Sequence, residues 1–423
     1  MIKTSLLALI SAAHLTTAYP STGNDDSFYP RLFTRDGPIN EWTSMGDSYA
    51  SGVGAGPQPE NDKNRCFRFP NAYPAVLQTS LKPQPPHWNQ VACSGNTATQ
   101  IKDNELLDEP KDDGKNGVRP RWGDNPEFVT ITMGGNDIGI LNLVATCILS
   151  FKLWGLDCEG VIKYGQGVID SDDFKKNLDD LMKAVIAKGR GTKVGDKFKV
   201  FVVGYAQFFN QKTTQCNDVT FKPSWNPLAA QYLTVERRTA MNTLAINLNK
   251  ALSDLANRFK DQGVYYIDYD QQMEGHRFCD REEPKPDDPD TYFFAYYTKD
   301  DPANAAAQRF FQNMPAYEAS IKGQGGPTLK TDEDYINALA DAAGDDPAAQ
   351  SFLSDTVRMF HPTSLGHQLI RDVVLKNLAS NGISGSSTGG DASSAPPPAP
   401  TKTEPPANPP PSKAPEPPTC TPK

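Results

Sequence analysis

Residues 127–133 read Glu-Phe-Val-Thr-Ile-Thr-Met, and residues 198–204 read Phe-Lys-Val-Phe-Val-Val-Gly. Short runs rich in β-branched and aromatic residues predict β-strands, and their near-continuous apolar character indicates strands covered on both faces. Further strands are expected at 41–46, 88–92 and 264–268. Because these runs alternate with helical stretches, the sequence predicts an α/β fold in which crossover helices connect the strands of a parallel sheet.

Three segments around these strands have helical character. Ser171 and the acidic residues after it form a favourable N-terminus for a helix over about 171–188. Apolar residues recur at helical spacing over about 228–260, and a further helix is expected from Ser364 to about Leu378. These helices are expected to cover the sheet.

The two ends of the chain differ in composition from its body. An apolar stretch too short to span a bilayer is followed by small residues up to Ala18, so residues 1–18 are predicted to be a secretory signal peptide. Residues 19–38 are predicted to be an N-terminal arm. Residues 384–423 are rich in proline and are expected to form a disordered tail that could contact a cell wall or glycans.

Residues 280–357 interrupt the alternation of strands and helices within an expected domain that spans 39–383. Long insertions in compact domains are often lids or binding surfaces. The insertion carries an aromatic cluster of Tyr292, Phe293, Phe294, Tyr296 and Tyr297. This cluster could face a substrate, or it could be a small core of the insertion itself.

The charge balance excludes one class of partner. A formal net charge of -9 and a pI near 5.2 provide no basic field to gather phosphates, so nucleic acid is not an expected partner. After the leader, no segment is apolar enough to be a transmembrane helix. A soluble monomer is expected.

Cysteine usage agrees with export. Six of the seven cysteines lie in the body, and the last, Cys420, lies in the tail. Six cysteines allow ~15 connectivities, but closure of local loops favours three pairs. These pairs are Cys66 with Cys93, Cys147 with Cys158, and Cys216 with Cys279. Since no Cys-x-x-Cys spacing occurs, a zinc site is not indicated, and the protein is expected to be secreted, extracellular and free of metals and cofactors.

Two polar motifs directly follow expected strands. Met45-Gly46-Asp47-Ser48 follows the first strand, and Gly134-Gly135-Asn136-Asp137 follows the third. Loops leaving the carboxyl ends of parallel strands gather in one crevice, so both motifs should face the same site. Ser48 is therefore the candidate nucleophile.

A serine hydroxyl needs a neighbouring base, and histidine is the usual one. Of the five histidines, His14 leaves with the signal, and His87 and His276 lie in or beside loops without an acylation motif. His361 precedes an expected helix start, whereas His367 falls inside that helix and is expected to be structural. His361 is therefore the candidate general base.

Acyl transfer also needs hydrogen-bond donors for the developing oxyanion. Gly95 follows the second strand and lets its backbone N–H approach a ligand closely. The Asn136 amide and the Ser48 N–H complete the candidate oxyanion hole. Asp47 and Asp137 are expected to brace these loops rather than to take part in chemistry.

Together these motifs resemble the SGNH hydrolase superfamily, and in particular its GDSL-type branch of secreted esterases and lipases. The four blocks of that superfamily are matched in order by Gly46-Asp47-Ser48, by Gly95, by Gly135-x-Asp137 around Asn136, and by His361. The resemblance covers residues 40 to 380 approximately. It implies a three-layer α/β/α sandwich with a flavodoxin-like, five-stranded parallel sheet, a metal-free active site, and disulfides near those paired above.

One position departs from the superfamily pattern. An aspartate commonly stands three residues before the histidine, where this chain has Arg358, which cannot accept the imidazole N–H. Asp355, Asp268 or Asp270 could orient the histidine instead, as could a backbone carbonyl. The carbonyl, which the resembled branch uses, is the leading interpretation and would make the site a Ser–His dyad.

The sequence thus predicts a secreted carboxylic ester hydrolase that acts through an acyl-enzyme on lipid, aryl or plant-polymer esters. A carbohydrate deacetylase with the same fold is an alternative that would read sugar hydroxyls with polar side chains. A second alternative is a noncatalytic, wall-associated binding protein that uses the proline-rich tail.

Overall fold

The computed structural model describes residues 38–57, 66–112, 118–150, 156–222, 229–281, 290–294 and 358–383. All of these residues belong to one compact unit, Met1–Ser386. The expected signal peptide, the proline-rich tail and all but the last residue of the arm lie outside the described residues, as does most of the expected insertion.

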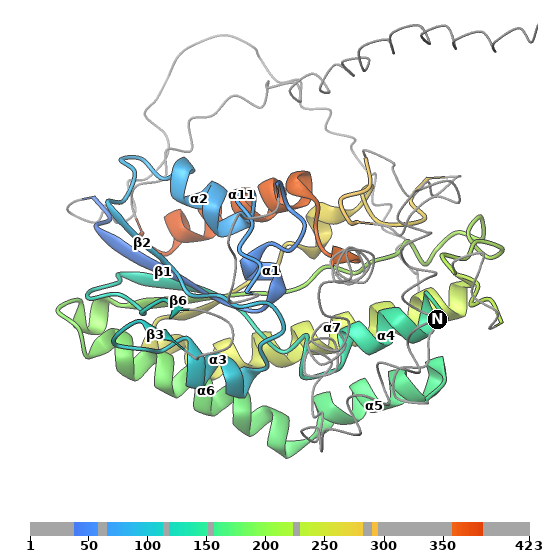
Figure 1. Cartoon of the computed structure of the whole chain (residues 1–423), viewed down its shortest axis with the longest axis horizontal. Helices are drawn as coiled ribbons and strands as arrows, with labels where there is room; N and C mark the ends of the chain where they lie inside the picture. Colours follow the sequence, from blue (N-terminus) through green and yellow to red (C-terminus); the bar gives the residue numbers. More distant parts are fainter. Residues whose placement is uncertain are drawn as a thin grey trace, which may run out of the picture. The chain divides into compact units, whose positions relative to one another are not determined.

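The unit is built on a parallel sheet of five strands in the order β2-β1-β5-β6-β7 (Figure 1). The strands are β1 (Glu41–Gly46), β2 (His87–Gln90), β5 (Phe128–Thr132), β6 (Lys199–Val203) and β7 (Val264–Ile267). Numbered within the sheet this is the 2-1-3-4-5 order of flavodoxin-like folds, and the chain reverses direction across the sheet between β1 and β5. A separate antiparallel pair joins β3 (Lys111–Asp112) to β4 (Val118–Arg119).

Helices cover both faces of the sheet, which confirms the three-layer α/β/α sandwich (Figure 1). On one face α2 (Tyr73–Ser80) packs against α11 (Ser364–Ser380). On the other face lie α3 (Ala98–Asn104), α6 (Asp172–Arg190) and α7 (Val235–Arg258), with α4 (Ile140–Cys147) and α5 (Cys158–Asp170) beside them. Short helical turns complete the described chain: α1 (Ser48–Ser51), η1 (Gly195–Lys197), η2 (Lys260–Gln262) and η3 (Asp270–Met273).

A row of aromatic rings crosses the sheet and ties its strands together. Trp42 of β1 stacks on Trp88 of β2 at 5.6 Å and on Phe128 of β5 at 5.2 Å between ring centroids. Phe201 of β6 continues the row, 6.0 Å from Phe128 and 5.5 Å from Tyr265 of β7. Such cross-strand pairs stabilise the pairing of neighbouring strands in the sheet.

Capping side chains decide where the long helices begin. Ser171 caps α6 by accepting a hydrogen bond from the Phe174 N–H at 3.2 Å, as expected. The predicted start of α7 at about residue 228 was wrong. Residues 229–234 are not helical, because the Leu233 N–H donates to the Val219 carbonyl and the Thr234 side chain caps the helix.

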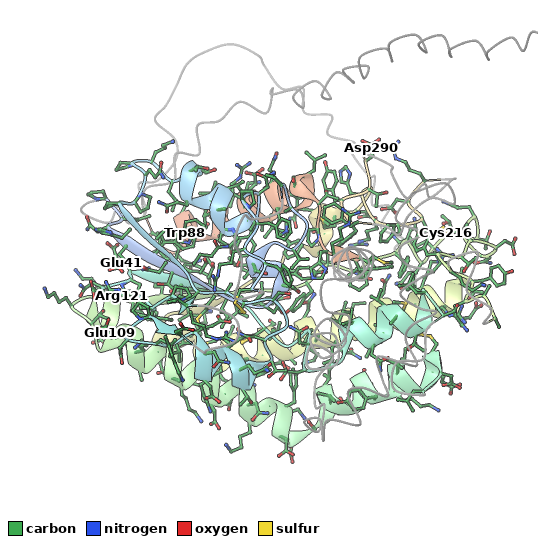
Figure 2. All side chains as sticks on the ribbon, viewed as in Figure 1. Glu41, Trp88, Glu109, Arg121, Cys216 and Asp290 are labelled. Atoms are coloured by element: carbon green, nitrogen blue, oxygen red, sulfur yellow. A yellow bond between two sulfur atoms is a disulfide. The ribbon has the colours of Figure 1, made fainter. Side chains whose placement is uncertain are left out.

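The three predicted disulfides are present, Cys66–Cys93, Cys147–Cys158 and Cys216–Cys279. The last of these links the loop after β6 to the loop after η3, and Figure 2 labels Cys216. Within the described part of the chain, no helix is long and apolar enough to cross a membrane.

Candidate active site

Ser48 stands at the carboxyl edge of the sheet because β1 ends in a glycine pressed against β5. Gly46 has φ +122°, and a Cβ at that position would lie 2.1 Å from the Thr132 carbonyl oxygen. Only glycine fits this backbone. Asp47 then caps α1 by accepting the Tyr49 N–H at 3.0 Å, so Ser48 is the first residue of the helix. Its N–H belongs to the first turn and has no intrahelical acceptor.

His361 reaches Ser48 from the segment before α11. Its Nε2 lies 2.6 Å from the Ser48 Oγ, and its Nδ1 lies 3.2 Å from the Met359 carbonyl oxygen. The contact with Ser48 joins residues 313 positions apart in the sequence. This is the spacing at which a base can take a hydroxyl proton.

Backbone hydrogen bonds hold the histidine segment against residues 290–294, the described part of the expected insertion. The Phe294 N–H donates to the His361 carbonyl at 3.0 Å, and the Phe360 N–H donates to the Phe294 carbonyl at 2.9 Å. The Thr363 N–H donates to the Tyr292 carbonyl, also at 2.9 Å. These backbone contacts therefore hold the segment that carries His361 in place.

Aromatic packing reinforces this support. Phe360 is buried with φ +61°, and its ring lies 5.0 Å from those of Phe208 and Phe278. Phe293 packs against the same two rings at 5.6 and 5.9 Å. Phe293 thus belongs to the core of the main domain, while Tyr296 and Tyr297 lie outside the described residues.

The three candidate oxyanion donors come from loops after neighbouring strands. Gly95 follows β2 with φ +82°, and among the described residues its N–H has no acceptor. Asn136 follows β5 and donates one Nδ2 proton to the Asn96 carbonyl at 3.1 Å, which leaves its second Nδ2 proton available. Asn136 and Ser48 line one pocket.

Asp47 and Asp137 brace these loops, as expected. The Asp47 carboxylate accepts the Thr132 hydroxyl at 2.7 Å and the Tyr205 hydroxyl. Asp137 accepts the Ala98 N–H at 3.0 Å. Burial raises the pKa of Asp47, against hydrogen bonds that lower it, and burial raises the pKa of Asp137 to about 6.

Sequence reasoning missed Glu105, which contacts the loops that carry the candidate oxyanion donors. Its side chain is fully buried and accepts the Gly46 N–H at 2.7 Å and the Asn96 Nδ2 at 2.6 Å. Burial raises the pKa of Glu105 well above its usual range, while these hydrogen bonds and the Arg68 charge lower it. Glu105 ends a short polar helix, and nothing in its sequence context distinguishes it from a surface residue.

His367 has the structural role expected for it. It is fully buried in α11, and its Nδ1 accepts the Tyr73 N–H at 3.1 Å. Burial lowers the pKa of His367 to about 3, with a smaller contribution from His361. The ring therefore stays neutral at the pH at which most esterases work.

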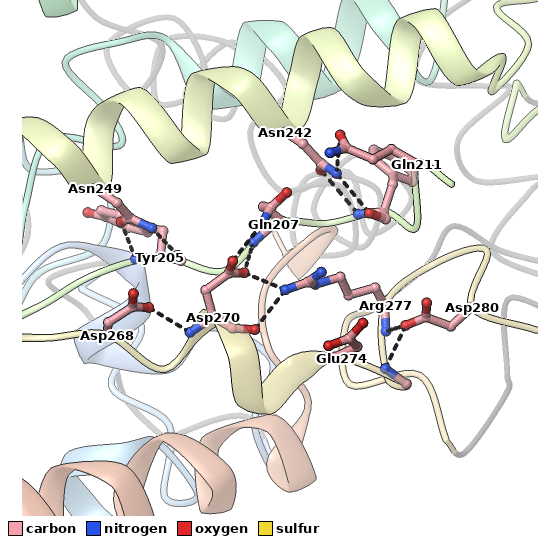
Figure 3. A network of polar contacts seen from close by, with 12 residues as sticks. Tyr205, Gln207, Gln211, Asn242, Asn249, Asp268, Asp270, Glu274, Arg277 and Asp280 are labelled. Atoms are coloured by element: carbon pink, nitrogen blue, oxygen red, sulfur yellow. Dashed lines mark hydrogen bonds and ion pairs between the residues drawn. The ribbon is translucent and has the colours of Figure 1, made fainter. Parts of the chain in front are cut away.

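Two of the three candidate orienting acids have other partners. Asp270 accepts the Gln207 N–H at 2.6 Å and forms an ion pair with Arg277 at 2.9 Å, and Asp268 accepts the Asp270 N–H at 2.9 Å (Figure 3). The structure therefore does not bring Asp268 or Asp270 to His361. Asp355 lies outside the described residues. The guanidinium of Arg358 lies 5.6 Å from the centroid of the Phe294 ring.

An apolar pocket opens beside Ser48 and Asn136. Helix α4 contributes Ile140 and Leu143 to its wall, and α7 contributes Met241, Leu244, Ala245 and Leu248. Tyr205 and Phe208, from the segment after β6, also line the pocket, together with Asp47, Tyr49, Gly135 and Ile138. Among the described residues, no group of three or more His, Cys, Asp or Glu side chains could hold a metal ion.

A parallel α/β sandwich with a serine and a histidine in contact at its carboxyl edge has the architecture of a serine hydrolase. The chain matches the GDSL-like Lipase/Acylhydrolase family over residues 44–294, which is more than half of its length. The protein therefore belongs to this family of ester-hydrolysing enzymes, as the four sequence blocks indicated.

Individual relatives are more distant. The chain is 25% identical over 279 residues to Lipase 1 of Streptomyces coelicolor, covering 66% of this chain and 86% of that lipase. It is also 25% identical over 279 residues to a lipase of Streptomyces rimosus, covering 66% of this chain and 82% of the relative. Among solved structures it is similar to phospholipase A1 from Streptomyces albidoflavus, with 25% identity, coverage of 58% and 85%, and a TM-score of 0.41.

Proposed function

We propose that this protein is a secreted carboxylic ester hydrolase that forms an acyl-enzyme on Ser48 with His361 as general base. The observation that carries the proposal is the 2.6 Å contact between Ser48 Oγ and His361 Nε2 at the carboxyl edge of the sheet. A serine in hydrogen-bond contact with a histidine base is the signature of nucleophilic catalysis.

In the proposed reaction, His361 takes the Ser48 proton as Oγ attacks the ester carbonyl carbon. The oxyanion that forms accepts hydrogen bonds from the N–H groups of Ser48 and Gly95 and from the Asn136 amide. The C–O bond to the alcohol then breaks, and His361 returns the proton to the leaving oxygen. Water attacks the acyl-enzyme by the same route and releases the carboxylic acid.

The Met359 carbonyl is proposed to orient the base. It lies 3.2 Å from His361 Nδ1 and can accept the N–H of that nitrogen, which leaves Nε2 as the basic atom facing Ser48. A backbone acceptor of this kind supports the Ser–His dyad interpretation. Substitution of Asp355 tests it directly, because Asp355 is the remaining carboxylate candidate.

The pocket beside Ser48 supports a substrate whose acyl group is apolar. Its helical wall is made of aliphatic and Met side chains from α4 and α7. Burying a CH₂ group against such a wall is worth about 0.8 kcal/mol, so longer acyl chains should bind more tightly until the pocket is filled. A carbohydrate deacetylase would need polar side chains to read sugar hydroxyls, and lipid or aryl esters fit this wall better.

Export is part of the proposal. The three disulfides are typical of oxidising compartments, and the apolar leader is typical of a secretory signal. Both observations support an enzyme that meets its ester outside the cell.

The test compares Ser48→Ala with Ser51→Ala, because Ser51 lies one helical turn away and its hydroxyl contacts the Ser48 carbonyl at 3.3 Å. We expect Ser48→Ala to abolish turnover of p-nitrophenyl esters and labelling by a fluorophosphonate, and Ser51→Ala to retain both. The wild-type protein should prefer apolar acyl groups larger than acetyl to acetate and to acetylated xylan. Preference for acetylated xylan would favour the deacetylase, and turnover by Ser48→Ala would exclude the scheme.

A further inference from the structure

Glu105 connects the loop that carries Ser48 to the loop that carries Gly95. It stands at the end of α3, and its two carboxylate oxygens point to different loops. Oε2 accepts the Gly46 N–H at 2.7 Å, two residues before Ser48, and Oε1 accepts the Asn96 Nδ2 at 2.6 Å, one residue after Gly95. The side chain is completely shielded from solvent, so these contacts compete with no water.

The same residue reaches the third oxyanion donor through Asn96. The Asn96 side chain donates to Glu105, while its backbone carbonyl accepts a proton from Asn136 Nδ2 at 3.1 Å. The loops that carry Ser48 and Gly95 are also hydrogen-bonded to each other directly, because the Cys93 N–H donates to the Gly46 carbonyl at 2.9 Å. All three candidate donors are thus connected to one buried carboxylate.

We propose that Glu105 is a positioning residue that holds the oxyanion donors of Ser48, Gly95 and Asn136 in register for the tetrahedral intermediate. The inference rests on the proposed function, because an oxyanion hole matters only if Ser48 is acylated. Oxyanion donors work within a few tenths of an ångström of one geometry, so loops that relax after loss of Glu105 would bind the ester normally and stabilise the oxyanion poorly. Glu105 touches no substrate atom and acts through the loops.

Glu105→Gln is the primary variant because it keeps the shape and removes one acceptor. With Asn96 in its present orientation, the amide NH₂ would face either the Gly46 N–H or the Asn96 NH₂, donor against donor, and only a turn of the Asn96 amide would relieve this. We expect kcat to fall by about tenfold or more with little change in KM. Asn96→Ala removes the side chain that donates to Glu105 Oε1 and should also lower kcat.

Rescue distinguishes this role from a general loss of stability. In the double variant Glu105→Gln with Asn96→Asp, the amide and the carboxylate exchange places, so both hydrogen bonds can form again. We expect this double variant to recover most of the lost kcat. A contribution of Glu105 to packing alone predicts no such recovery.

Glu41→Gln is the matched control, because Glu41 is a buried acid at the start of β1, the strand whose last residue, Gly46, donates to Glu105 (Figure 2). Its carboxylate accepts the Asn89 Nδ2 at 2.8 Å and the Asn125 N–H at 2.6 Å. Glu41→Gln should lower the melting temperature and leave kcat unchanged.

The second readout is affinity for an alkylboronic acid, whose tetrahedral adduct with a serine oxygen resembles the intermediate. We expect Glu105→Gln to bind it about tenfold more weakly than wild type. Equal kcat and equal boronate affinity in Glu105→Gln and wild type would overturn the inference. It would also be overturned if Glu41→Gln, at a similar loss of melting temperature, lost as much kcat and boronate affinity as Glu105→Gln. A wild-type protein that forms no adduct and is no more active than Ser48→Ala would overturn the proposed function and the inference with it.

Discussion

The serine side of the site and its histidine side are held by different kinds of contact. The serine side, residues 46–48, 95–96 and 135–137, rests on buried carboxylates that accept backbone N–H groups and hydroxyls. The histidine side, residues 290–294 and 358–363, rests on backbone hydrogen bonds and packed phenylalanine rings. The first arrangement should respond to protonation and to the loss of single charges, and the second to changes in shape.

The largest effect should follow removal of the base. His361→Ala leaves the carboxylate ties of the serine side intact, and we expect kcat to fall by on the order of 10⁴-fold or more. Steady-state hydrolysis of a short aryl ester measures the loss. His276→Ala is the control, because His276 stacks on Tyr292 at 3.7 Å on the histidine side and is not part of the pair. Equal losses in both variants would contradict the assignment of the base.

Loss of a single oxyanion donor should cost less. We expect Asn136→Ala to lower kcat by about 10²- to 10³-fold, with KM nearly unchanged, because the donor acts on the oxyanion rather than on the bound ester. Asn136→Asp should be no better, since a carboxylate has no proton to donate. Full activity in either variant would remove Asn136 from the oxyanion hole.

The buried carboxylates of the serine side should also make the free energy of unfolding depend on pH. Because burial raises the pKa of Asp137 to about 6, the native state holds this proton more tightly than the unfolded chain does. The free energy of unfolding should therefore fall as pH rises from about 4 to about 6, by on the order of 3 kcal/mol from this group. Urea denaturation of wild type and Asp137→Asn at several pH values isolates the effect, and parallel curves would contradict it.

The smallest effect is expected at Asp355. If the Met359 carbonyl orients His361, Asp355→Asn should keep kcat within about twofold of wild type. A triad acid would reveal itself instead by a loss of about 10⁴-fold, which is the cost of removing such an acid elsewhere. Arg358→Ala serves as the neighbouring control and should retain activity in either case.

Much of the fold was predictable because its signals are local. The apolar runs of β5 and β6 and the serine cap of α6 depend on neighbours in sequence, and each was located within a few residues. Ser48 and His361 were also found from local motifs, and the sheet topology explains why they share one edge. Their catalytic roles stay predictions until the variants are measured.

The missed features depend on contacts between distant segments. Glu105 is buried only because α3 packs beside β1, and a glutamate at the end of a polar helix carries no sign of this. Residues 290–294 pair with the histidine segment through backbone groups, which any residue type can supply. The start of α7 was placed too early because apolar spacing continues upstream of Thr234, where the backbone bonds to Val219 instead.

The separation of 313 residues between Ser48 and His361 has a consequence for synthesis of the chain. Among the described residues, the last strand of the sheet ends at Ile267 and the last paired cysteine is Cys279, so these strands and disulfide partners emerge from the ribosome before His361 does. If His361 is the base, a nascent or truncated chain that stops short of residue 358 would hold an unactivated serine. Under the proposed mechanism, ester hydrolysis would therefore begin only after most of the described domain has been synthesised.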